Sequence, residues 1–189
     1  MSAFVNQKEY ENKSWTKECQ GVTSDGRYWY ISSNNEHEQG VNRFDIDMTH
    51  RKFFDLSGAR CDHLGDIDYY NGRLYCAMEK PQRLVVLPVA RFDHPDGGFL
   101  KAELKDHDGG DTPQGKSMPW CAMRPGEDLI YSSAFGTETN TVSTIYAYHR
   151  FDDGEYRHVP EKDISLDTAV ARIQGGSFSE NALLLSSYQ

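Results

Sequence analysis

One phrase occurs four times along the chain, and this repeat limits the possible folds more than any other feature. Each copy has a short apolar segment, a polar turn and a second apolar or aromatic segment that ends in small or polar residues. The turns lie at Gly26, Gly72, Glu127 and Asn181, so successive copies are separated by 46, 55 and 54 residues. A repeat of this length that consists of strands predicts a series of small sheets instead of one large sheet.

The segments between the phrases supply further strands. The predicted strands lie near residues 20–23, 28–32, 41–46 and 52–56, then 67–70, 74–78, 83–89 and 99–104, then 120–123, 129–133, 144–149 and 156–159, and finally 171–178 and 183–187. Only residues 165–173 show any helical tendency, for one or two turns at most. The pattern therefore predicts three four-stranded antiparallel units and two strands of a fourth, near residues 19–58, 63–105, 118–160 and 170–189.

Four-stranded units repeated around an axis are the blades of a β-propeller. The phrases at residues 74–77 (Leu-Tyr-Cys-Ala) and 129–132 (Leu-Ile-Tyr-Ser) resemble those of six-bladed propellers of the NHL, strictosidine-synthase and gluconolactonase-like kind. The resemblance covers residues 19–187 and implies one all-β propeller domain over residues 1–189, with about three and a half blades. None of the catalytic signatures of these families falls on this sequence residue by residue.

Three and a half blades cannot close a ring, because a propeller needs four or more. The open end would leave sheet edges unpaired. We therefore expect that the missing blades of a longer chain, or a second copy in a homo-oligomer, complete it. Residues 1–18 contain Phe4, Val5, Tyr10 and Trp15 in a polar background. They form either a closing strand or a loose segment before the first blade.

The charge balance excludes two classes of partner. The chain has 20 Lys and Arg against 29 Asp and Glu, a net charge of −9. Nucleic acids need a cationic surface, and anionic lipids repel an acidic one, so neither partner is expected. No transmembrane segment and no secretory signal are visible, which indicates a cytoplasmic protein. The expected ligand is a small molecule or another protein.

Propellers bind ligands where the central channel opens, at the ends of the innermost strands. The strongest candidates there are His63, Asp66 and Asp68, directly before and within a predicted innermost strand. Alternation places both carboxylates on one face, where they could bind a divalent cation such as calcium together with His63, or act as an acid–base pair. Alternatively, the two aspartates accept hydrogen bonds from backbone amides and join neighbouring blades.

Gln20, Trp120 and Gln174 occupy similar places in the other units. Together with Glu79, which follows a second strand, they would form a polar ring with one aromatic wall at the channel mouth. The alternative is that Trp120 packs in the core and that the two glutamines make structural hydrogen bonds.

Residues 106–111 (Asp-His-Asp-Gly-Gly-Asp) have the composition of a calcium loop, because carboxylates alternate with residues that allow a tight turn. Their spacing differs from that of an EF-hand, which favours a solvated loop between strands. The sequence contains neither a nucleophile elbow nor a phosphate-binding loop.

Two functions are consistent with these residues. The first is a binding or scaffold propeller whose ligand or partner occupies the channel mouth. The second is a metal-dependent hydrolase or lactonase-like enzyme, in which His63, Asp66 and Asp68 would hold a cation that polarises a carbonyl or phosphoryl oxygen. The first is favoured, because the other units carry Gln20, Cys121 and Gly176 where the second unit is acidic.

Overall fold

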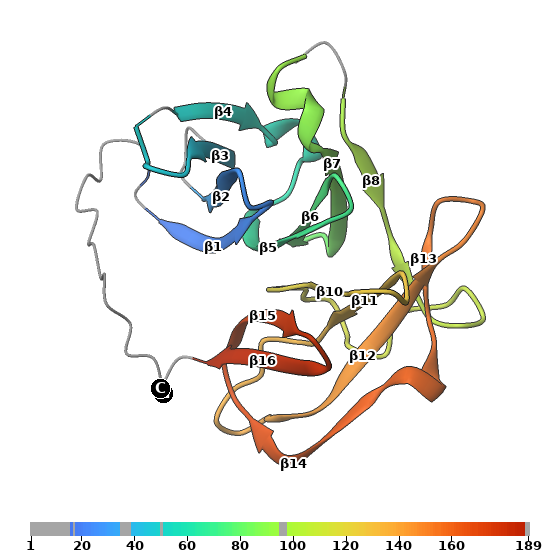
Figure 1. Cartoon of the computed structure of the whole chain (residues 1–189). Helices are drawn as coiled ribbons and strands as arrows, with labels where there is room; N and C mark the ends of the chain where they lie inside the picture. Colours follow the sequence, from blue (N-terminus) through green and yellow to red (C-terminus); the bar gives the residue numbers. More distant parts are fainter. Residues whose placement is uncertain (1–15, 17, 35–38, 50, 95–97, 188–189) are drawn as a thin grey trace.

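Four sheets, antiparallel except for one strand pair, make up the described part of the molecule and lie around a common centre (Figure 1). The computed structural model describes residues 16, 18–34, 39–49, 51–94 and 98–187. The innermost strands of the sheets, β1, β5, β10 and β15, approach one another at that centre. Their bounds are Cys19–Ser24, His63–Tyr70, Ala122–Arg124 and Ile173–Ser179.

Within each sheet, consecutive strands pair in sequence order. The first sheet continues with β2 (Tyr28–Ser33), β3 (Gly40–Asp45) and β4 (Arg51–Asp55), the second with β6 (Arg73–Glu79), β7 (Arg83–Pro88) and β8 (Leu100–Ala102), the third with β11 (Leu129–Ser132), β12 (Val142–Arg150) and β13 (Tyr156–His158), and the last with β16 (Ala182–Ser187) alone. The predicted all-β fold of four-stranded antiparallel propeller blades, with a half blade at the end, is confirmed.

The hairpin between β5 and β6 shows how the repeated phrase produces a blade. Asn71 and Gly72 both have positive φ angles, of 49° and 77°. This conformation belongs to the two-residue turn whose twist matches that of paired strands, and asparagine and glycine adopt it most easily. The alternating residues on either side then pair from Tyr70 with Arg73 to Ile67 with Cys76.

Both faces of the second sheet are buried, as blade packing requires. Along β6, Leu74, Cys76 and Met78 belong to the core shared with the first sheet. Tyr75 and Ala77, which point to the opposite face, belong to the core shared with the third sheet. A third core joins the third sheet to β15 and β16, and its fully buried members include Trp120, Tyr131 and Ile173.

Two segments differ from the sequence prediction. Residues 165–173 show a helical tendency of one or two turns at most in the sequence, but β14 (Ile164–Val170) is a strand that pairs with the first half of β12. The nine-residue β12 extends past β11, so its free edge offers this segment hydrogen bonds that a short helix would lack. The predicted strand 99–104 is divided, because β9 (Leu104–Lys105) leaves the second blade and pairs in parallel with β13.

The longest described segment without a regular element joins β9 to β10 and covers residues 106–121. In the residues that the structure describes, three 3-10 turns lie between strands, at Ser57–Ala59, Val89–Phe92 and Pro160–Lys162. Within the part of the chain that the structure describes, no helix has the length and apolar character needed to span a membrane. The predicted closing strand or lead-in at residues 1–18 lies outside the described residues except for Thr16 and Glu18, as do residues 188–189 of the last predicted blade.

Candidate functional site at the channel mouth

Three of the four innermost strands have a register irregularity near their start. The shifts lie between Cys19 and Gly21 in β1, between Leu64 and Ile67 in β5, and between residues 173 and 175 in β15. The residues without a partner in β1 and β15 are Gln20 and Gln174. A β-bulge bends its strand and turns the extra side chain out of the regular ladder, often at the rim of a barrel or next to a functional site.

The bulged ends of these strands surround a cavity of about 230 Å³, which we call the mouth cavity. Its lining residues come from all four sheets or the segments that join them, and they are Gln20, His63, Glu79, Pro119, Phe135 and Gln174. The structure therefore brings together Gln20, His63 and Gln174, as the sequence predicted, and places Glu79 beside them. His63 and Glu79 are direct partners across the β5–β6 pair.

The imidazole of His63 is held by a side-chain amide of the first blade. The Nδ2 atom of Asn34 donates to Nδ1 of His63 over 3.0 Å and to a carboxylate oxygen of Glu18 over 3.1 Å. The Oδ1 atom of Asn34 accepts the backbone N–H of Leu64 over 3.2 Å. Because the amide donates to Nδ1, the neutral ring of His63 carries its proton on Nε2.

The repeat pattern of the sequence did not indicate three residues near the mouth cavity, which are Asn34, Pro119 and Phe135. Asn34 directly follows β2, Glu79 ends β6, and Phe135 lies just after β11. All three therefore occupy similar places in their blades, at the end of the second strand or just after it. Aligning the four phrases over a few more residues would have placed Asn34 and Phe135 beside Glu79 at the mouth.

Asp66 lies at the centre of the molecule and joins β5 to β15. Its side chain is buried, with 7% exposure. One carboxylate oxygen accepts the N–H of Gly176 over 3.1 Å, and the other accepts the N–H of Ile67 over 2.8 Å. The backbone N–H of Asp66 donates to the carbonyl of Pro119 over 2.9 Å. Asp66 thus links three blades.

Asp68 makes a second set of links from the same strand. Its Oδ2 atom accepts the N–H of Met123 in β10 over 2.7 Å. Its Oδ1 atom accepts the N–H of Tyr69 over 2.9 Å and the hydroxyl of Thr23 in β1 over 3.5 Å. Both aspartates therefore make the backbone hydrogen bonds that sequence analysis gave as the alternative to a ligand site.

The structure does not gather His63, Asp66 and Asp68 into the predicted metal site. Nδ1 of His63 faces Asn34, while the two carboxylates accept amides of other blades. Trp120 does not line the mouth cavity either. Its side chain is fully buried, and its indole N–H donates to Oγ of Ser133 over 2.9 Å. The aromatic wall expected from Trp120 is instead supplied by Phe135.

Burial makes the two central carboxyl groups weaker acids. The loss of hydration raises the pKa of Asp66 from its ordinary value of 3.8 to about 7, against the effect of its two amide donors. Burial likewise raises the pKa of Asp68 to about 6. The folded chain therefore binds these protons more tightly than the unfolded chain does.

This difference predicts a pH dependence of stability. The favourable effect of protonated Asp66 is complete below about pH 4 and is lost as the pH rises to about 7. We expect it to lower the unfolding free energy of the wild type across that range by on the order of 3 kcal/mol. Urea unfolding measured between pH 4.5 and 7.5 should show a smaller decrease of the unfolding free energy with pH for Asp66→Asn, because its side chain has no proton to lose. Equal slopes for Asp66→Asn and the exposed control Asp152→Asn would contradict the prediction.

A second, more open depression lies between the first blade and the last sheet. This open groove has a volume of about 420 Å³, and Gln20, Gly21, Asp66 and Gln174 contribute to its walls. The apolar side chains of Val22 and Leu184 in this region are 59% and 60% exposed. Among the described strands, β16 pairs only with β15. The groove therefore lies beside an edge of β16 that has no partner among the described strands.

This chain is similar to known proteins in its structure but not in its sequence. No model of a known protein family matches the sequence, and no curated protein matches it. The structure is similar to the computationally designed Ika4 protein, with 9% identity, a TM-score of 0.47 and coverage of 90% of this chain and 85% of that one. It is also similar to glutaminyl cyclase from Myxococcus xanthus, with 16% identity, a TM-score of 0.48 and coverage of 89% and 67%.

A third similar structure is the PQQ-bound aldose sugar dehydrogenase from Streptomyces coelicolor. It has 12% identity and a TM-score of 0.40, with coverage of 89% of this chain and 74% of that one. The assignment of propeller blades to this chain rests on its own strand pairing and on the burial of both blade faces.

Proposed function

We propose that this chain is a β-propeller binding module whose ligand occupies the mouth cavity. The observation that supports this proposal is the convergence of Gln20, His63, Glu79 and Gln174 on one cavity. These side chains come from three different sheets, and bulges in β1 and β15 turn two of them out of the strand ladder. Polar groups that converge on a concave site from rigid strands are typical of ligand recognition.

The lining residues indicate the chemistry of the ligand. Two side-chain amides offer both donors and acceptors, and the imidazole of His63 is oriented by Asn34. Among the described lining residues, Glu79 is the single carboxylic acid, and no lysine or arginine accompanies it. Phe135 and Pro119 supply an apolar wall. We therefore propose a small cationic or neutral ligand with hydrogen-bonding groups and a small apolar part.

Binding can be tested with defined probes. Thermal unfolding of the full chain should be measured with polyols, primary amines and quaternary ammonium compounds, followed by calorimetric titration of the most stabilising compound. Replacing Glu79 by glutamine keeps the shape of the cavity and removes its charge. We expect Glu79→Gln to weaken binding of a cationic probe about tenfold, which corresponds to about 1.4 kcal/mol.

Glu180→Gln provides the matched control, because Glu180 is exposed in the turn between β15 and β16, outside the cavity. Gln174→Ala should weaken neutral and cationic probes alike. If a probe stabilises the wild type, Glu79→Gln and Gln174→Ala equally, it binds elsewhere and the proposed site is wrong. A panel in which no probe stabilises the wild type would likewise count against a small-molecule site.

The alternative function is a metal-dependent hydrolase or lactonase-like enzyme, as in some six-bladed propellers of the gluconolactonase-like kind. It needs His63, Asp66 and Asp68 to share a cation such as calcium, although the two carboxylates already accept amides of neighbouring blades. Bound metal measured by mass spectrometry, and lost in Asp66→Ala but kept in His107→Gln, would support this alternative. A cytoplasmic location also stays a prediction from the sequence.

We further propose that additional blades complete the ring beside β16. Two observations support this proposal: Val22 and Leu184 are exposed in the region of the open groove, and one edge of β16 has no partner among the described strands. A second copy of the chain or the missing blades of a longer chain could supply these sheets. Light scattering of the purified chain distinguishes the two, since only the first source gives a dimer.

A further inference from the structure

The parallel pairing of β9 with β13 brings a cluster of metal-ligand side chains to the outer edge of the third blade. Leu104 pairs with Tyr156, and Lys105 pairs with Arg157. The next residues along the two strands are Asp106 and His158, which therefore lie side by side. His107 follows in the loop after β9. This cluster lies on the outermost strands, away from the innermost strands that form the mouth cavity.

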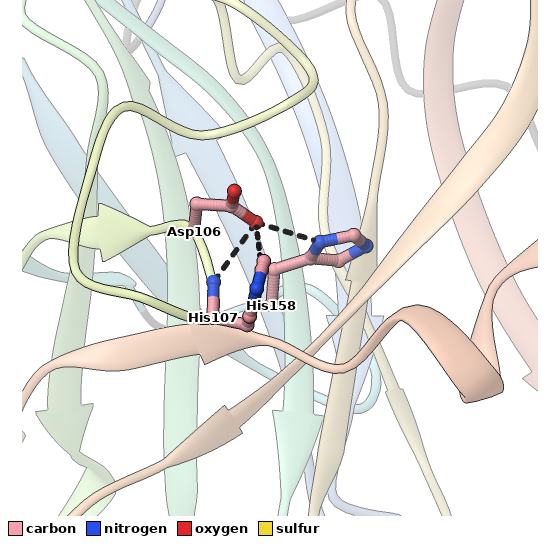
Figure 2. A group of neighbouring side chains, drawn as sticks. All are labelled: Asp106, His107 and His158. Atoms are coloured by element: carbon pink, nitrogen blue, oxygen red, sulfur yellow. Dashed lines mark hydrogen bonds and ion pairs between the residues drawn. The ribbon is translucent and has the colours of Figure 1, made fainter.

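Asp106 is the meeting point of the cluster. Figure 2 shows the imidazoles of His107 and His158 directed at the same carboxylate oxygen. The distances from that oxygen are 3.1 Å to Nδ1 of His107 and 3.0 Å to Nδ1 of His158. One ligand atom from each of the three residues lies within 4.8 Å of the others. The loop at residues 106–111, which the sequence predicted to be a solvated loop between strands, thus contributes Asp106 and His107, and the third side chain, that of His158, comes from another strand.

The contacts of His158 hold its ring in the way that is usual for a metal-binding histidine. Its ring is buried, with 8% exposure, between the rings of Tyr146 and Tyr148. Its Nε2 atom lies 2.9 Å from a carboxylate oxygen of Asp163, and Asp163 also accepts the N–H of Ala147 over 3.0 Å. A histidine ligand usually donates its second N–H to such a carboxylate, which fixes the ring and leaves the first nitrogen for the metal.

We propose that Asp106, His107 and His158 bind a divalent zinc ion, with Asp163 as the positioning residue of His158. Two imidazole nitrogens and one carboxylate oxygen are a ligand set that suits zinc, whereas calcium takes six to eight oxygens. Ligands at about 2.1 Å in a tetrahedral site are separated by about 3.4 Å, so modest opening of the cluster is sufficient. Zinc binds Nδ1 of the neutral imidazole, so any proton on that nitrogen is released to solvent on binding.

The site is accessible, and an ion there would have a structural effect. The side chain of His107 is 63% exposed and that of Asp106 is 28% exposed, which leaves a path for the ion and for a water ligand. Asp106 and His107 follow β9, and His158 ends β13. A bound ion would therefore link the segment that joins the second blade to the third with the outer edge of the third blade.

The proposal is tested by titrating zinc chloride alone into the full, untagged, chelator-treated chain in a calorimeter. One zinc ion per chain is expected, with calcium chloride at least about 100-fold weaker. His107→Gln, at an exposed position, should weaken zinc at least tenfold without changing the circular dichroism of the metal-free chain. His149→Gln, an exposed histidine on β12 of the same blade, should bind zinc as the wild type does.

Asp163→Asn tests the positioning role, because the amide oxygen still accepts from His158 but carries no charge. A loss of about tenfold or more in zinc affinity, with the stoichiometry unchanged, is expected. Absence of zinc binding by the wild type would overturn the proposal. Equal zinc affinity of the wild type and His107→Gln would do so as well, since the ion would then lie elsewhere.

Discussion

Replacing Gly65 with alanine is expected to destabilise the chain by more than about 3 kcal/mol. A Cβ atom on Gly65 would lie 2.2 Å from the carbonyl oxygen and 2.9 Å from the carbonyl carbon of Pro119. Both atoms belong to the backbone, so no side-chain rotation relieves the overlap. The next residue, Asp66, donates its N–H to that same carbonyl. The methyl group would therefore force β5 away from the segment before β10 and break this link between blades.

Urea unfolding followed by tryptophan fluorescence measures this effect. Gly98→Ala serves as the control, because no atom lies within 4 Å of a Cβ atom built at Gly98. For a chain of this size, a loss of about 3 kcal/mol lowers the thermal midpoint by roughly 6–12 °C. If the two variants agree within about 1 kcal/mol, the close approach of these two inner segments does not constrain the fold.

Replacing Trp120 with alanine is expected to cost about 3–5 kcal/mol, because its side chain is fully buried. The ring of Trp120 fills the space above Gly176, where a Cβ atom would lie only 2.4 Å from Cζ3 of the indole. Trp120 and Ile173 belong to the core that fastens β15 and β16 to the third blade. The effect should therefore be largest in the last sheet.

Hydrogen exchange followed by mass spectrometry locates this effect. Amides of residues 173–187 should exchange faster in Trp120→Ala, while those of residues 63–79 change less. Trp29→Ala, at a half-buried tryptophan of the first blade, is the matched comparison and should leave residues 173–187 as in the wild type. A uniform increase across the chain in Trp120→Ala would show that the last sheet does not depend on this contact.

The blades could be predicted because the sequence signals for their strands and turns lie within a few residues of one another. Asn71 and Gly72 specify a tight turn, and the alternating residues of β6 specify a strand with two buried faces. β14 and β9 could not be predicted, since neither has a strong pattern of its own. β14 is a strand because β12 extends past β11, and β9 joins β13 because the two meet in space.

The mouth residues were predicted in part for the same reason. Gln20, His63 and Gln174 hold equivalent places in the repeat, so one position in the phrase indicated one place in the molecule. Asp66 and Asp68 hold such a place too, but their residue types alone did not tell whether they face a ligand or backbone amides. That distinction depends on Gly176 and Met123, which lie more than 50 residues away in sequence.

The sequence by itself determined the strands other than β9 and β14, their grouping into blades and the end of each blade that faces the mouth. Period-two burial and turn chemistry act over a few residues, so one chain segment is enough to reveal them. Only the tertiary structure decided which side chains meet across blades: Asp66 with Gly176, Trp120 with Gly176, and Asp106 with His158. Hydrogen bonds and contacts of this kind depend on distances of a few ångströms between segments of different blades. The repeat pattern shows that the blades are alike but does not show which of their residues come into contact.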